Sequence, residues 1–262
     1  IDCGDGSVAD VLEGEGITEI AQMVFTHHHR DQACGAAAVM SDKTKVAVPA
    51  AERKWFDDVA SYWNSPKSRW HVYNFHPHHL MLAESIRVDE ALADGQTFAF
   101  GPAKIEVLQT PGHTNGSVSY VVQVDGRRVI FSGDCIYDEG QIWDIFSMQK
   151  GIPRGDRYTS DYHGFLGSRK ELYASLERIK QAEPAVLVPS HGRIITDPAA
   201  AVDRLIERMK RCYHKYVATS ALRHYFPEAF AEFAGAEDHM PIRPGKQVPD
   251  CLEHFGTSWI IV

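Results

Sequence analysis

The sequence has no long apolar run and no excess of basic residues, and each absence excludes a class of protein. The longest apolar stretches, such as Ser258 to Val262, have the length of a strand, whereas a transmembrane helix needs about 20 residues. The 27 basic residues are outnumbered by 35 acidic ones, and the net charge of -8 has the wrong sign for gripping phosphate backbones. We therefore expect neither a membrane nor a nucleic acid as partner.

Cysteine is scarce and irregularly placed. The five cysteines are odd in number and form no C-x-x-C pair, so they predict neither a disulfide framework nor a zinc knuckle. This pattern favours a reduced compartment such as the cytoplasm. The chain begins at Ile1 without Met, which leaves open a leader segment missing from its start.

The rest of the composition is typical of a folded globular chain, with 44% hydrophobic and 24% charged residues. Apolar patterns predict strands at Gln22 to Thr26, Lys45 to Val48, Phe98 to Phe100, Ile105 to Leu108, Val118 to Val124, Arg128 to Phe131 and Val186 to Val188. Helices are expected after Ser7, over Ala50 to Asn64, from the Ser168 capping box to Pro184, and after Asp197. This order predicts a layered α/β fold with helices outside the sheets.

Four polar clusters follow predicted strands. They contain His27, His29 and Asp31 in the segment Thr26 to Gln32, His113 after Pro111-Gly112, Asp134 after Ser132-Gly133, and His191 between Ser190 and Gly192. Any one of these histidines is more often an ordinary polar group. Together they predict a metal centre, because neutral imidazoles bind zinc and similar ions while carboxylates offset the charge. The His-x-His-x-Asp spacing places alternate side chains on one side of an extended backbone, so one turn can serve two metal positions.

Several nearby side chains receive other interpretations. His28 and Arg30, at the intervening positions, are expected to point away from the metal. Tyr137 is expected to pack beside the Asp134 loop, with donation to an oxyanion as the alternative. His163 is either a substrate contact or part of a turn, and four further histidines are expected in a solvated loop: His71, His76, His78 and His79.

In combination these motifs resemble the metallo-β-lactamase superfamily over about Ile1 to Ile195. The segment Thr26 to Gln32 with Gly35 is similar to the glyoxalase II signature, whereas Phe131 to Ile136 with Glu139-Gly140 is similar to the lactamase-like endoribonucleases. The resemblance implies an αββα sandwich with metals at one edge of its two sheets. This fold would either lack its first strand or be completed by the C-terminal one.

The resemblance also implies which residues hold the metals. It assigns His27, His29 and His113 to the first site, Asp31 and His191 to the second, and Asp134 as a bridge between them. Gln32 stands where the family has a second-site histidine, and its neutral amide is a weaker donor, so we expect a partial or absent second ion. The expected cofactor is one or two zinc ions, with iron or manganese as alternatives.

The ends of the chain suggest a division into a lactamase-like domain at 1–224 and a C-terminal arm at 225–262. Gly256 to Val262 resembles the strand that opens the superfamily fold. It is therefore expected to open a second, tandem domain or to complete the first sheet in a permuted order. An unrelated terminal strand is a third interpretation.

The predicted activity is that of a metal-dependent hydrolase. Metal-bound hydroxide would attack an ester, thioester, amide or phosphodiester of a small-molecule substrate, with Asp31 and Asp134 as the catalytic carboxylates. One alternative is a mononuclear iron oxidoreductase resembling the persulfide dioxygenases, because the second site is weakened. The other is a non-catalytic lactamase-like module. The sequence indicates no oligomeric state.

Overall fold

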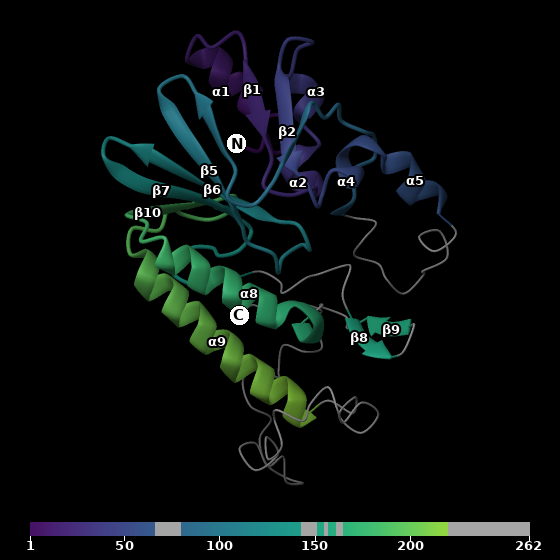
Figure 1. Cartoon of the computed structure of the whole chain (residues 1–262), viewed down its shortest axis with the longest axis vertical. Helices are drawn as coiled ribbons and strands as arrows, with labels where there is room; N and C mark the ends of the chain where they lie inside the picture. Colours follow the sequence, from purple (N-terminus) through teal and green to yellow (C-terminus); the bar gives the residue numbers. More distant parts are fainter. Residues whose placement is uncertain (66–79, 143–150, 155–156, 161–164, 220–262) are drawn as a thin grey trace.

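The computed structural model describes residues 1–65, 80–142, 151–154, 157–160 and 165–219 (Figure 1). The histidines His71, His76, His78, His79 and His163 lie outside this range, as does the predicted arm at 225–262. Within the described segments, no helix combines the length and the apolar character needed to cross a bilayer.

Two sheets form the centre of the structure. The first is parallel, in the order β1 (Gln22–Val24), β2 (Lys45–Pro49) and β3 (Glu90–Leu92). The second has the order β10 (Val186–Pro189), β7 (Arg127–Gly133), β6 (Val118–Val124), β5 (Ala103–Gln109) and β4 (Thr97–Phe100). Its pairs are antiparallel except β10 with β7. A separate hairpin joins β8 (Gly151–Arg154) to β9 (Arg157–Ser160). Each strand predicted within the described residues is present, and β3, β8 and β9 were not predicted. The strand predicted at Gly256 to Val262 lies outside the described residues.

The helices are α1 (Val8–Gly14), α2 (Arg30–Ala33), α3 (Ala36–Val39), α4 (Lys54–Asp57), α5 (Val59–Asn64), α8 (Phe165–Gln181) and α9 (Pro198–Thr219). Two predictions are wrong in detail. The helix expected over Ala50 to Asn64 is broken into α4 and α5, and α8 begins before Ser168, which therefore does not cap it. Asp197 does cap α9, since its Oδ1 accepts the Ala200 N–H at 3.2 Å, whereas Ser7 makes no side-chain cap.

The buried side chains of the described residues form three apolar layers. One lies between the two sheets and includes Val24, Val107 and Tyr120. Another packs Val46 of the parallel sheet against Phe56 of α4, with further residues from the neighbouring helices. The third joins the five-stranded sheet to α8 and α9, which run side by side in Figure 1. Helix, sheet, sheet and helix layers are the αββα arrangement that the resemblance to the metallo-β-lactamase superfamily implied.

Strand direction places the polar clusters at one edge. Strands β5, β7 and β10 run in the same direction, so their carboxyl ends lie together. The end of β1 meets them at Thr26, whose carbonyl accepts the Val118 N–H at 3.0 Å. Gly133 ends β7 with a φ of 55°, and a Cβ added there would lie 3.0 Å from Thr26. A glycine at this position therefore allows the ends of the two sheets to approach closely.

Candidate metal centre

Three histidines from two loops converge in the interior. The potential ligand atoms of His27, His29 and His113 all lie within 4.8 Å of one another, and all three side chains are buried. The Nε2 atom of His113 lies 2.9 Å from Nδ1 of His29. The rings meet edge to face, with centroids 4.6 to 4.8 Å apart. Such an arrangement brings three nitrogen donors to one point, as a zinc-type ion requires.

The burial and the neutral charge of the His27 ring fit those of a metal ligand. Its Nε2 atom is buried and has no hydrogen-bond partner among the described residues, an arrangement that costs free energy unless a cation binds there. Burial lowers the pKa of His27 well below its usual value, and the neighbouring His113 adds to this effect. Burial has the same effect on the pKa of His29. Both rings are therefore neutral, which is the form that binds a metal ion.

A hydrogen-bonded chain fixes the orientation of His27. Thr26 donates its backbone N–H to Asp2 Oδ1 at 2.8 Å and its hydroxyl to Asp2 Oδ2 at 2.9 Å. Because that hydroxyl proton is used, Thr26 Oγ1 accepts from Nδ1 of His27, 3.0 Å away, and leaves Nε2 with its lone pair. Ser190 also donates to Asp2, at 3.1 Å. Burial raises the pKa of Asp2 to about 6, although the bonds from Thr26 oppose this.

This role of Asp2 was not predicted from the sequence. The residue stands in the opening Asp2-Cys3-Gly4, and nothing in that segment says which imidazole it supports. Only the pairing of the chain's first residues with β1, seen in the bond from the Asp2 N–H to the Val24 carbonyl at 2.9 Å, brings it to Thr26.

The second group contains Asp31, Asp134 and His191, whose potential ligand atoms also lie within 4.8 Å of one another. His191 Nε2 lies 2.8 Å from Asp31 Oδ2. Asp134 Oδ2 lies 3.3 Å from Nε2 of His113 and 3.8 Å from Nε2 of His191. Asp134 therefore stands between the two groups, which is the position expected for a bridge.

The charges of the second group depend on burial and pairing. Burial raises the pKa of Asp134 to about 7. Burial also acts to raise the pKa of Asp31, but the hydrogen bond and charge of His191 outweigh it, and the pKa falls below its ordinary value. The bond to Asp31 in turn raises the pKa of His191. Without a metal, Asp31 and His191 thus form a charge-assisted pair.

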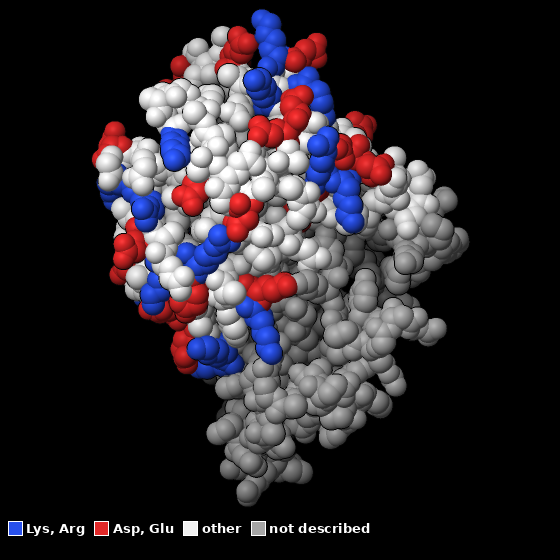
Figure 2. Space-filling view, viewed as in Figure 1, with Lys and Arg blue, Asp and Glu red and all other residues white. Residues whose placement is uncertain are grey.

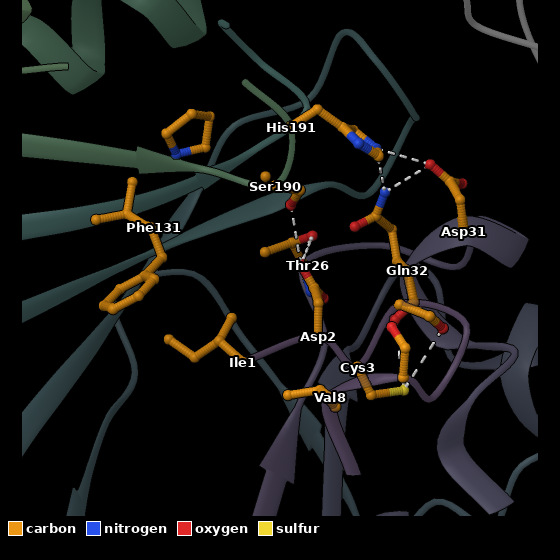
Figure 3. Close-up of a pocket in the computed structure, with 15 residues that line it drawn as sticks. Ile1, Asp2, Cys3, Val8, Thr26, Asp31, Gln32, Phe131, Ser190 and His191 are labelled. Carbon is orange, nitrogen blue, oxygen red and sulfur yellow. Dashed lines mark hydrogen bonds and ion pairs between the residues drawn. The ribbon is translucent and has the colours of Figure 1, made fainter. Parts of the chain in front are cut away.

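Gln32 points its amide between Asp31 and His191, as Figure 3 shows. Its amide Nε2 donates to Asp31 Oδ2 at 2.9 Å and to Asp134 Oδ1 at 3.4 Å, and it lies 3.2 Å from Nε2 of His191. The side chain is buried. A cavity of about 380 Å³ opens beside it, and Asp31 and His191 also line this cavity. The amide therefore takes hydrogen-bonding positions that a second cation would otherwise contact.

The other polar candidates bond to groups outside the imidazole cluster. His28 is not one of the clustered donors, and its ring bonds to the buried carboxylate of Glu52, although it also meets the His29 ring edge to face with centroids 5.0 Å apart. Arg30 donates to the carbonyl of Met81 at 2.9 Å. Tyr137 is buried, hydrogen bonds to Asp134, and meets His191 edge to face with ring centroids 5.6 Å apart. Tyr137 therefore supports the two ligand loops from the interior.

Comparison with known proteins gives one family. A family model described as the metallo-beta-lactamase superfamily matches residues 1–191. A hydroxyacylglutathione hydrolase of Shewanella is 27% identical over 58% of this chain and 52% of its own length. An atrochrysone carboxyl ACP thioesterase of Passalora fulva is 27% identical over 80% of this chain and 50% of its own length.

A metallo-beta-lactamase family protein from Thermus thermophilus has a similar fold. Its TM-score is 0.58 at 17% identity, over 92% of this chain and 83% of its own. At that identity the likeness concerns the fold alone. The chain spans about half the length of the curated relatives it matches.

Proposed function

The chain belongs to the metallo-β-lactamase superfamily, and from that premise we propose that it is a metal-dependent hydrolase acting on a small molecule. The observation that carries the proposal is the buried Nε2 of His27, which has no hydrogen-bond partner in the described structure and faces a cluster of further donors. We propose His27, His29 and His113 as the first metal site. For a second, weaker site we propose Asp31, Asp134 and His191, with Gln32 beside them.

When bound, a zinc-type ion would lower the pKa of water toward ~7 and polarise the bond to be cleaved. Asp31 suits the role of the group that orients the attacking water and takes its proton at a carboxylate oxygen, because its side chain is 45% exposed. Asp134 suits the role of a bridge, since it is buried between the two groups of ligands. Zinc fits the donor set, with iron or manganese as alternatives.

The relatives favour an ester or thioester among the possible substrates. The hydroxyacylglutathione hydrolase and the ACP thioesterase are both named for cleaving acyl groups from thiol carriers. The net charge of -8 argues against a nucleic-acid phosphodiester. We therefore propose a small acyl thioester or ester, and we further propose residues 1–224 as the domain that cleaves it, with 225–262 as an arm.

A second candidate is a mononuclear iron oxidoreductase. The position of Gln32 favours it, because the amide contacts Asp31 and Asp134 where a second ion would otherwise bind. Iron chemistry that uses oxygen needs only one ion with open positions. The third hypothesis is a non-catalytic module, which would require the donor cluster to bind no metal.

Two measurements test these hypotheses. They are elemental analysis of the purified chain and a screen of thioesters, p-nitrophenyl esters and bis-phosphodiesters as substrates. The hydrolase proposal expects zinc or a similar ion near one equivalent, and thioester or ester cleavage that a chelator abolishes. Tightly held iron with oxygen uptake would support the oxidoreductase instead. A chain that binds no metal and cleaves none of these compounds would overturn both.

A further inference from the structure

We infer that Glu52 is a positioning residue that holds the two loops of the first metal site at their working separation. This inference rests on the proposed function, because it concerns the affinity of that site for its ion. Glu52 follows the end of β2 and is completely buried. Among the described residues, its hydrogen bonds go to none of the proposed ligands. The sequence pattern placed Glu52 within a helix.

One oxygen of Glu52 binds the loop that carries His27 and His29. Oε2 accepts the backbone N–H of His28 at 3.3 Å and also a hydrogen bond from its ring nitrogen Nδ1. His28 lies between the two proposed ligands in the sequence, so fixing both its backbone and its ring constrains the neighbours on either side. This contact gives the buried ring of His28 a partner, although His28 is not one of the proposed ligands.

The other oxygen binds the loop that carries His113. Oε1 accepts the backbone N–H of Gly116 at 2.8 Å, and the carboxylate also accepts a bond from the side chain of Thr114. The loop is closed by Ser117, whose Oγ accepts the Thr114 N–H at 3.0 Å. One carboxylate therefore joins two loops whose histidines, His29 and His113, are 84 residues apart.

Gly116 leaves room for this carboxylate because it has no side chain. A Cβ at Gly116 would lie 2.7 Å from both Cγ and Oε1 of Glu52, and 2.8 Å from Cβ of Ala51. The backbone of Gly116 is not in the left-handed region, so the absence of a side chain serves close approach rather than an unusual backbone angle. Four donors surround the Glu52 carboxylate, namely the N–H and ring Nδ1 of His28, the N–H of Gly116 and the hydroxyl of Thr114. They require an acceptor at each oxygen, which a carboxylate supplies and an amide does not.

The experiment compares zinc affinity in the wild type, Glu52→Gln, Gly116→Ala and the double variant. A chelator competition measures the affinity, and the absorption spectrum of the Co²⁺-loaded protein reports ligand geometry. Glu52→Gln keeps the shape but turns an NH₂ toward a donor, so we expect affinity to fall by ~10–100-fold. Gly116→Ala should have a similar effect by displacing the carboxylate. The two changes should be non-additive, because both act on one contact.

Two controls separate positioning from stability. Glu106→Gln removes a charge from an exposed position of β5. Ile179→Val loosens the core under α8, on the other side of the five-stranded sheet. Neither should alter the affinity or the Co²⁺ spectrum.

The inference is overturned if Glu52→Gln and Gly116→Ala both fold and bind zinc as the wild type does. It is also overturned if Ile179→Val, at an equal loss of stability, lowers zinc affinity as much as Glu52→Gln and Gly116→Ala do. A double variant whose loss of affinity is the sum of the losses of Glu52→Gln and Gly116→Ala would overturn it as well. Should Glu52→Gln fail to fold, the zinc affinity of Gly116→Ala is compared with that of the wild type and of Ile179→Val, and that comparison alone decides. A wild-type chain that takes up no metal would overturn the proposed function and this inference with it.

Discussion

The imidazole of His191 lies 2.8 Å from the carboxylate of Asp31, although 160 residues separate them in the sequence. His191 follows β10 and Asp31 lies in α2 after β1, so this contact joins one edge strand of the five-stranded sheet to the parallel sheet. The amide of Gln32 bonds to the same Asp31 oxygen. The second group of donors is thus held together by its own hydrogen bonds.

Removing one imidazole of the first site should remove the metal. We expect His113→Ala to lower metal content to background and hydrolytic activity to that of the chelated protein, because two imidazoles cannot hold zinc as three do. Elemental analysis and a thioester assay measure the two quantities. A control is Glu106→Gln, which changes an exposed side chain of β5 and should retain the metal. Full metal content in His113→Ala would contradict the ligand assignment.

Restoring an imidazole at the second site should raise the stoichiometry. Gln32→His replaces an amide that contacts Asp31, Asp134 and His191 with a better donor. We expect the metal-to-protein ratio to rise from near one toward two in a titration with zinc. Gln32→Leu, which offers no donor, should stay near one. An unchanged ratio in Gln32→His would mean that Gln32 does not limit the second site.

Metal binding should stabilise the fold. A ligand that binds only the folded chain at 100 times its Kd adds about 2.7 kcal/mol, which corresponds to a rise in Tm of roughly 5–10 °C for a chain of this size. Thermal unfolding with zinc and after chelation measures the difference, and His113→Ala is the matched control, since its Tm should not respond. An identical Tm with and without zinc in the wild type would count against a site in the folded core.

The hydroxyl of Tyr120 should stabilise the contact between the sheets. It is wholly buried and donates to the carbonyl of Phe25 at 2.6 Å. Tyr120→Phe leaves that carbonyl without this donor, so we expect the free energy of unfolding to fall by about 1–3 kcal/mol. Denaturant unfolding measures it, while metal stoichiometry should stay unchanged. A variant as stable as the wild type would show that the bond contributes little.

Regular elements were predictable where a local pattern dominates. The hairpin between β6 and β7 follows from Asp125-Gly126, with positive φ at both residues. The break between α4 and α5 could not be predicted, because the N–H of Val59 bonds to the hydroxyl of Ser85 at 3.1 Å, 26 residues away. Strand β3 was missed because its three residues form a strand by pairing with β2, which lies far from them in the sequence. In both cases the deciding contact is remote in the sequence.

The sequence by itself determined which potential metal donors the chain supplies. The motifs around His27, His113, Asp134 and His191 supply imidazoles and carboxylates after strands, and these donors suit a zinc-type ion wherever they meet. What only the tertiary structure decided is which nitrogen of His27 is free and what holds the loops around it. Those depend on Asp2 and Glu52, which reach Thr26 and His28 across the fold. Strand pairing brings such groups together, and spacing along the chain does not encode distances across a sheet edge.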